Sequence, residues 1–275
     1  MPDTGPSNPA RVVFALPHME QVPVKKDVLY KTVSGMELRY DLYYPRNFQP
    51  GDVRPAIIFI HGEAPPDILK DAKEWGQYVS WGQLAAASGL IAVTFTHRSS
   101  EFFSKLDDVA SDVSALLDEV LSKAQGLGID ANRLGLWMAS GGTPVGLGLL
   151  LRNAYPFVRC AAAFYGRMNL APVRAKIPAS VSDEMLRAYS PVYHLRQLDN
   201  PQSIPPLLIA RAGRDGLRGV NESIDEFVAE ALARNLHFEL HNHPDGEHGF
   251  DILNDDDHSR EIVRRTLAFF QEHLL

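Results

Sequence analysis

The stretch 133–142 constrains the fold of this chain more than any other part of the sequence. It contains the apolar run Leu134–Ala139, which is long enough for a buried strand and too short for a helix. Ser140 and two glycines follow and interrupt the run. A second run of apolar and small residues, 145–151, is typical of a buried helix. The order of these pieces predicts a tight strand–turn–helix unit with Ser140 at the turn.

Such a unit can carry a reactive serine. A serine hydroxyl is a weak nucleophile, so it must stand clear of the backbone and reach a base. A sharp, strained turn does this and needs small neighbours, which Gly141 and Gly142 supply. The helix that follows directs its positive end at the serine, where an oxyanion would form. The pattern departs from the motif G-x-S-x-G at Met138, and alone it equally fits a turn with an incidental serine.

Composition narrows the classes of protein and partner. A length of 275 residues fits one large α/β domain, which we place at 11–275 behind a Pro-, Gly- and Ser-rich tail at 1–10. A formal net charge of -7 disfavours nucleic acid and anionic membrane surfaces as partners. The sequence contains no run of membrane-span length, no signal-peptide pattern and no dinucleotide, P-loop or zinc motif. A single cysteine, Cys160, excludes an internal disulfide, and we expect a cytoplasmic protein.

Strands and helices are expected to alternate along most of the chain. Alternation of this kind predicts a mostly parallel sheet with helices on both faces. The stretch 166–203 is irregular, with one short helix expected at 182–187. Strands are expected at 27–32, 36–43, 56–60, 90–96, 134–139, 160–165, 205–211 and 237–241, and helices at 75–87, 106–123, 145–151, 223–234 and 259–274. The polar face of the helix at 106–123 should carry Asp107, Asp108 and Asp112.

Polar residues directly follow several of these strands. In such sheets, ligands bind at the carboxyl ends of the strands. The residues found there are His61-Gly62-Glu63, Ser140, Tyr165, Asp215 and the loop 241–250. Acyl transfer by a serine needs a base to take the hydroxyl proton and a carboxylate to hold that base in one tautomer. Ser140, Asp215 and a histidine near 248 supply these types, with Asp245 and Asp251 as rival carboxylates.

Four stretches resemble those of α/β-hydrolases, of the small serine esterase and dienelactone-hydrolase-like kind. They are Ile-Phe-Ile-His-Gly at 58–62, Arg-Leu-Gly-Leu-Trp leading to Ser140, Pro-Leu-Leu-Ile leading to Gly-Arg-Asp at 213–215, and Gly-Glu-His-Gly-Phe at 246–250. The order serine, aspartate, histidine is also that of this family. The resemblance implies an α/β-hydrolase fold with an eight-stranded, mostly parallel sheet whose second strand is antiparallel. No large cap is expected, because 166–203 is too short for one.

The same resemblance implies the roles of the site residues. Ser140 would be the nucleophile, Asp215 the acid and His248 the base, with an oxyanion hole formed by the backbone N–H groups of Glu63 and Gly141. No metal or organic cofactor is implied. The loop at 61–64 lacks the further glycines of the lipase-type His-Gly-Gly-Gly loop. Dienelactone hydrolases use cysteine as the nucleophile, so a serine here favours an esterase.

The sequence therefore predicts a serine hydrolase that cleaves small or medium carboxylic esters. His61, Gly62 and Tyr165 are candidates for the substrate pocket, although Tyr165 also fits a packing role. The side chain of Glu63 is expected to be a solvated loop carboxylate without a role. Two alternatives stay open: a peptidase or amidase with the same triad, and a non-catalytic ligand-binding homologue.

Overall fold

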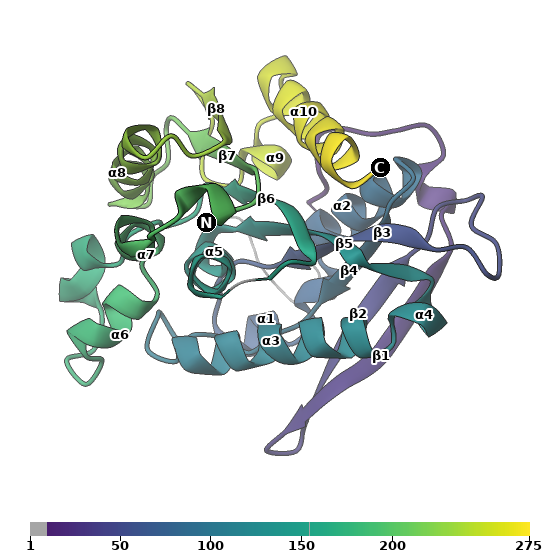
Figure 1. Cartoon of the computed structure of the whole chain (residues 1–275), viewed down its shortest axis with the longest axis horizontal. Coiled ribbons are helices and arrows are strands. Elements are labelled where there is room, and N and C mark those ends of the chain that lie inside the picture. Colours follow the sequence, from purple (N-terminus) through teal and green to yellow (C-terminus); the bar gives the residue numbers. More distant parts are fainter. Residues whose placement is uncertain (1–9, 154) are drawn as a thin grey trace.

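The computed structural model of the chain describes residues 10–153 and 155–275, and its strands form one sheet (Figure 1). Apart from residue 10, the tail expected at 1–10 lies outside the described residues. The sheet has eight strands in the order β1-β2-β4-β3-β5-β6-β7-β8. The strands are β1 Val24–Val33, β2 Met36–Tyr43, β3 Arg54–Ile60, β4 Ile91–Phe95, β5 Ile129–Ala139, β6 Val158–Phe164, β7 Leu207–Ala212 and β8 Phe238–His243.

The sheet is parallel except at β2, which runs antiparallel to both β1 and β4. All pairs from β4 through β3 to β8 are parallel. This is the eight-stranded arrangement with an antiparallel second strand that the resemblance implied. Strand β3 shows why the central strands read as unbroken apolar runs: Ile57 and Phe59 pack into the core on one face, and Ile58 and Ile60 into the core on the other.

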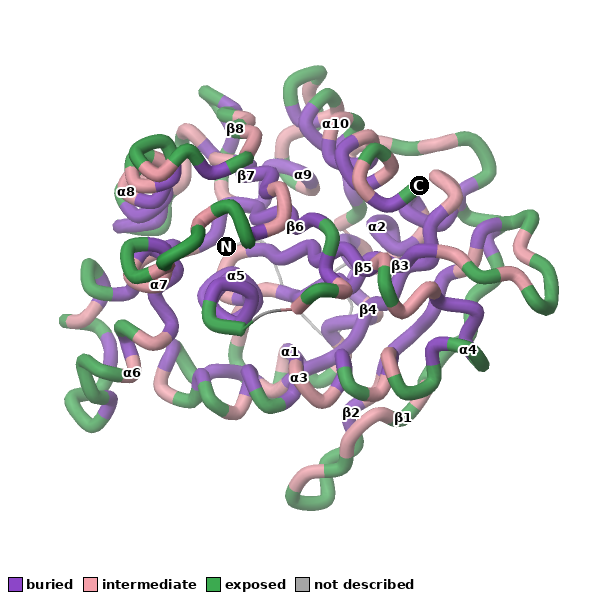
Figure 2. The backbone as a smooth tube through the Cα atoms, in the orientation of Figure 1, coloured by how far each residue is buried: buried purple, intermediate pink, exposed green. Residues whose placement is uncertain are grey.

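Helices cover both faces of the sheet (Figure 1). One core contains residues of α2 and α10, and the other contains residues of α3, α5, α7 and α8. The central strands are buried along most of their length, whereas the tip of the β1–β2 hairpin and the outer turns of the helices are exposed (Figure 2). The helices are α1 Pro66–Leu69, α2 Gly76–Ala87, α3 Leu106–Ser122, α4 Ala124–Leu127, α5 Thr143–Arg152, α6 Asp183–Ala188, α7 Pro191–Gln197, α8 Val220–Ala233, α9 Phe250–Leu253 and α10 Asp257–Leu274.

Short 3-10 turns and the irregular segment complete the chain. The turns are η1 Met19–Gln21, η2 Ala72–Glu74, η3 Ser140–Gly142, η4 Ala171–Lys176 and η5 Pro201–Ser203. The stretch 166–203 contains the short helix expected at 182–187, which is α6, and also α7, which the sequence did not predict. Helix α7 packs against α5 and α8, so this stretch extends the helical layer and does not form a large separate cap.

The prediction for Asp112 is wrong. Its side chain is fully buried, where a polar helix face was expected. It accepts hydrogen bonds from Lys31 Nζ at 2.7 Å and from Arg98 Nε at 2.8 Å. Burial opposes ionisation of Asp112, but the bonds from Arg98 and Lys31 outweigh it and hold the pKa below its usual value. The carboxylate thus ties α3 to β1 and to the loop after β4.

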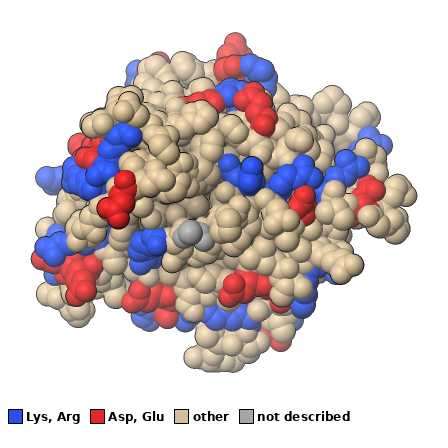
Figure 3. Space-filling model, viewed as in Figure 1, with Lys and Arg blue, Asp and Glu red and all other residues tan. Residues whose placement is uncertain are grey.

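Charged side chains of both signs are interspersed over the face of the molecule shown in Figure 3. Among the described residues, charged side chains form ion pairs within one element or between neighbouring elements, as Arg265 of α10 does with Glu239 of β8. Pairs of this kind at the surface contribute little to stability. Among the described residues, we find no helix with the length and apolar character needed to cross a membrane.

Candidate active site

Three side chains from three strand ends meet at the carboxyl edge of the sheet. Ser140 follows β5, Asp215 lies in the loop after β7, and His248 lies in the loop after β8. The Ser140 hydroxyl lies 2.8 Å from His248 Nε2, and His248 Nδ1 lies 2.7 Å from Asp215 Oδ2. Parallel strands of one sheet place their carboxyl ends at the same edge. For this reason Ser140 and Asp215, which are 75 positions apart in the chain, can lie in one line with His248, which is 33 positions after Asp215.

The backbone at Ser140 is strained, as a turn that projects its side chain requires. Its φ is 49°, in the left-handed region that residues with a side chain seldom adopt. A Cβ atom on Gly141 would overlap Glu63, and one on Gly142 would overlap the carbonyl oxygen of His61. Glycine is therefore required at both positions, because the loop after β3 lies directly against the turn.

Met138 occupies the motif position usually held by glycine, and a glycine on the next helix makes room for it. Met138 is fully buried in β5. A Cβ atom on Gly146 of α5 would lie 2.8 Å from Ile60 Cδ1 and 3.2 Å from Met138 Sδ. Strand β5 and helix α5 can thus still approach closely, because the glycine that allows it is Gly146 on the helix and not a glycine on the strand.

The carboxylate of Asp215 lies against Nδ1 of His248 and away from solvent. Its side chain is fully buried, while that of His248 is 23% exposed. Oδ2 accepts from His248 Nδ1–H, and Oδ1 accepts from the backbone N–H of Leu217 at 2.8 Å. With Nδ1 protonated, Nε2 is free to accept the Ser140 proton. The two rival carboxylates lie elsewhere: Asp245 is exposed and pairs with Arg214, and Asp251 is buried among other partners.

The loop after β3 presents one free backbone donor beside the serine. Gly62 N–H donates to Tyr78 Oη at 2.9 Å, and Gly62 O accepts from His61 Nδ1–H at 2.8 Å. Within the described part of the chain, Glu63 N–H donates to no acceptor. That nitrogen lies 3.0 Å from the position that a Cβ on Gly141 would occupy. The backbone N–H of Glu63 therefore lies beside the turn at Ser140 and Gly141, where a polar atom of a ligand could accept its hydrogen bond.

The side chain of Glu63 is half-buried and hydrogen-bonded, which differs from the solvated loop carboxylate that was expected. One carboxylate oxygen accepts from the Ser99 hydroxyl, and the other accepts from Ser100 N–H at 2.8 Å. The segment it holds continues into three consecutive left-handed residues, Glu101, Phe102 and Phe103, with φ of 45°, 56° and 67°. The carboxylate thus ties the loop after β3 to a strained turn after β4. Phe103 is buried, and Phe102 is exposed.

His61 is the first residue after β3 and is buried. Its ring stacks on that of His97 at 3.5 Å between centroids, and its Nε2 accepts from His97 N–H at 3.1 Å. Burial, followed by the neighbouring His97, sets the pKa of His61 well below its usual value, so the ring is neutral. Gly62 lies against Ser140, since a Cβ on it would be 3.2 Å from Ser140 Cβ. Tyr165, the third pocket candidate, is buried beside His248, with ring centroids 4.8 Å apart.

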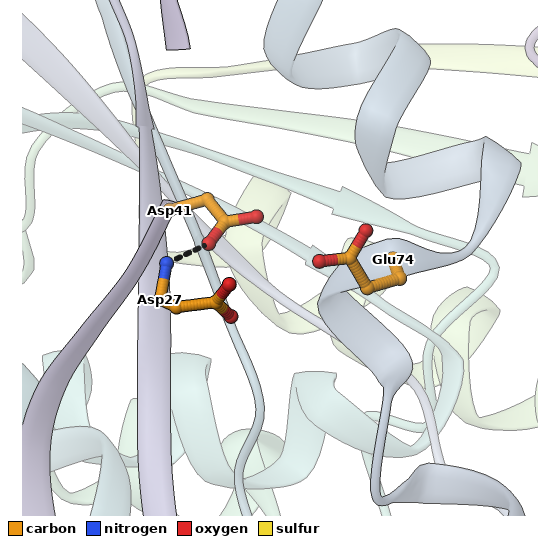
Figure 4. Close-up of side chains that lie close together, drawn as sticks. All are labelled: Asp27, Asp41 and Glu74. Carbon is orange, nitrogen blue, oxygen red and sulfur yellow. Dashed lines mark hydrogen bonds between the residues drawn. The ribbon is translucent and has the colours of Figure 1, made fainter. Parts of the chain in front are cut away.

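A group of acidic side chains on β1, β2 and η2 is arranged around a lysine. Asp27, Asp41 and Glu74 point toward a common space (Figure 4). The ammonium of Lys73 lies in that space, 2.8 Å from Asp27, 3.0 Å from Asp41 and 2.7 Å from Glu74. Burial opposes the charge of Lys73, but the hydrogen bonds that its ammonium donates to the three carboxylates raise its pKa above the usual value. The cluster is therefore a partly buried ion-pair network that joins β1 and β2 to η2.

Sequence reasoning missed the residues that support the site from α2. Tyr78 holds Gly62, while Gln77 and Trp81 hold Asp251. The one available signal was that the segment 75–87 carries polar and aromatic residues without a solvent-facing stripe, as expected for a helix buried on nearly all sides.

The sheet order, the helices on both faces and the strained serine turn together define the α/β-hydrolase fold, and solved structures similar to this chain share it. One is the propionate-bound form of a thermophilic esterase, esterase 2 of the planctomycete Thermogutta terrifontis. It is 20% identical, with a TM-score of 0.72, over 93% of this chain and 96% of that one. The apo form of the same protein is 19% identical, with a TM-score of 0.71, over 94% of this chain and 98% of that one. The form phosphorylated by paraoxon is 20% identical, with a TM-score of 0.68, over 92% of this chain and 93% of that one. No protein-family model and no curated protein sequence matches the chain.

Proposed function

We propose that this protein is a serine hydrolase that cleaves carboxylic esters with short acyl chains. The observation that carries the proposal is the continuous line from Ser140 Oγ through His248 to the buried Asp215, with distances of 2.8 Å and 2.7 Å. This arrangement activates a serine for attack on an acyl carbon. A free backbone donor at Glu63 beside the same serine adds the means to stabilise an oxyanion.

In the proposed reaction, Ser140 Oγ attacks the ester carbonyl carbon while its proton moves to His248 Nε2. The carbonyl oxygen becomes an oxyanion that accepts hydrogen bonds from Glu63 N–H and Gly141 N–H. Asp215 stabilises the imidazolium and keeps its orientation. Collapse of the tetrahedral intermediate breaks the ester C–O bond, and the leaving alcohol takes the proton from Nε2. Water then gives a proton to Nε2 and attacks the acyl carbon. The bond between that carbon and Ser140 Oγ breaks, Oγ takes the proton from Nε2, and the carboxylic acid leaves.

The structural neighbours support the reaction class and the acyl size. Esterase 2 of Thermogutta terrifontis has been solved with propionate and with butyrate, and in forms phosphorylated by paraoxon or phosphonylated by sarin. Propionate and butyrate correspond to short acyl products. We extend this preference to the present chain, because the two chains share the fold over 93% of this one.

The test is steady-state hydrolysis of matched p-nitrophenyl esters of two to twelve acyl carbons, beside p-nitroanilides of the same acids. We expect kcat/KM to be highest at about two to four carbons and the anilides to react at least about a hundredfold more slowly. Ser140→Ala serves as the control and should abolish turnover. Anilide rates equal to the ester rates favour a peptidase or amidase, and no turnover of either series by folded wild type favours a ligand-binding protein.

A further inference from the structure

Asp251 is a buried carboxylate that the proposed reaction does not use. It lies in α9, three residues after His248, and is completely buried. Its oxygens accept from the Tyr165 hydroxyl at 2.6 Å, from Gln77 Nε2 at 2.9 Å and from Trp81 Nε1 at 2.9 Å. We call these four residues the Asp251 network.

The network contains no cation. In the described part of the chain, Asp251 forms no ion pair with any lysine, arginine or histidine. Burial raises the pKa of Asp251, and the three hydrogen-bond donors only partly offset this. An amide or apolar side chain would fill the same space at lower cost. The hydrogen bonds of Asp251 join α9 to α2 and to Tyr165, the residue whose ring lies beside His248.

Tyr165 links the network to the catalytic histidine. Its ring centroid lies 4.8 Å from that of His248, at an interplanar angle of 59°. Both ring nitrogens of His248 are already engaged by Asp215 and Ser140, so its ring is held in the remaining directions by packing. Tyr165 also has a φ of 38°, a strained conformation directly after β6. The strain places the ring beside the imidazole, and its contact with Phe250 at 5.6 Å supports it from another side.

Two physical effects follow from this placement. The Tyr165 hydroxyl donates to Asp251 and accepts from Gln77 Nε2 at 2.8 Å, so the ring has one fixed position. A fixed ring limits the tilt of the imidazole, and catalytic groups need orientation to within about 10–20°. An aromatic ring also attracts a cation within about 6 Å, and donation to a carboxylate increases its electron density. The imidazolium that forms during turnover is such a cation.

A substrate-binding role for Tyr165 fits less well, because only 2% of the residue is exposed. We propose that Tyr165, fixed by Asp251, is a positioning residue that holds the imidazole of His248 and stabilises its protonated form during ester hydrolysis. This inference rests on the proposed function. In this account Asp251 is not the acid that accepts from His248 Nδ1; it supports His248 through Tyr165.

The test compares Tyr165→Phe and Asp251→Asn with wild type on the best short-chain ester. Tyr165→Phe keeps the ring and removes the hydroxyl. We expect kcat to fall about five- to twentyfold in each variant, with KM within about twofold, because the histidine is affected and the substrate contacts are not. The double variant should lose no more than about the larger single loss, since Asp251 acts through the Tyr165 hydroxyl.

The matched control is Tyr189→Phe, which removes another tyrosine–aspartate hydrogen bond of 2.6 Å, to Asp107, outside the triad and its contacts. It should leave kcat unchanged while lowering the melting temperature. The inference is overturned if folded Tyr165→Phe and Asp251→Asn keep wild-type kcat, or if their losses multiply in the double variant. If Asp251→Asn does not fold, Tyr165→Phe decides alone. Turnover that persists in Ser140→Ala contradicts the proposed function separately, whatever Tyr165 does.

Discussion

Replacing Asp215 with asparagine should disable the histidine through its tautomer. The backbone N–H of Leu217 donates to Oδ1 of Asp215, so the amide oxygen of an asparagine would take that position. The amide NH2 would then occupy the place of Oδ2, 2.7 Å from His248 Nδ1. A donor there forces Nδ1 to accept, which moves the imidazole proton to Nε2. Nε2 would then face the Ser140 hydroxyl as a donor and could not take its proton.

The expected loss follows from this change of tautomer. The same substitution in a serine protease triad costs about ten-thousandfold in kcat, which corresponds to about 5 kcal/mol of transition-state stabilisation. We expect at least about a hundredfold here, since water at the 23% exposed His248 can partly restore the tautomer. The assay is kcat on a short-chain p-nitrophenyl ester, with folding checked by circular dichroism. Asp245→Asn, at an exposed carboxylate paired with Arg214, is the control and should stay within about twofold. Near-normal turnover in folded Asp215→Asn, beside an inactive Asp245→Asn, would refute the assignment.

Three further predictions concern the surroundings of the triad. Glu63→Pro removes the proposed oxyanion donor and should lower kcat about a hundredfold or more. Glu63→Gln can still accept from Ser100 N–H and should stay within about fivefold; equal losses in the two variants would mean that the charge of Glu63 itself takes part. Lys73→Ala leaves the fully buried Asp41 without its cation and should lower the unfolding free energy by about 3–5 kcal/mol. Without the ammonium, the three carboxylates can bind a cation, so millimolar Ca²⁺ should recover part of this loss in the variant and leave the stability of the wild type unchanged. Equal stabilisation of both proteins would contradict the conclusion that Lys73 occupies the space between the carboxylates. Burial depresses the pKa values of His61 and His97, so stability should be full above about pH 6.5 and decline as pH falls below it. Urea unfolding at pH 7 and pH 5 measures this, and His97→Asn should flatten the dependence.

The strand ends made much of the candidate site predictable. The carboxyl ends of parallel strands meet at one edge, so residues that follow separate apolar runs come together without any knowledge of side-chain contacts. This placed Ser140, Asp215 and His248 beside one another. The first and last residues of the strands were less predictable, because backbone pairing with a neighbouring strand decides them. Strand β5 starts at Ile129, five residues before the expected strand, because Ile129 pairs with Arg54 of β3.

The supporting contacts could not be predicted, because they join residues far apart in the chain and leave no local period. Glu63 reads as a loop carboxylate until the fold brings Ser99 and Ser100 to it. Gln77 and Asp251 are 174 positions apart. Asp112 reads as part of a polar face because the cations that neutralise it come from β1 and the loop after β4.

The most direct measurement of the central claim is covalent labelling with a fluorophosphonate, followed by peptide mass spectrometry. An activated serine reacts with such a probe and an ordinary turn serine does not. We predict one label per chain, on Ser140, with loss of labelling in Ser140→Ala and strong slowing in Asp215→Asn. Folded wild type that stays unlabelled at mildly alkaline pH, or that carries the label on another serine, would contradict the account.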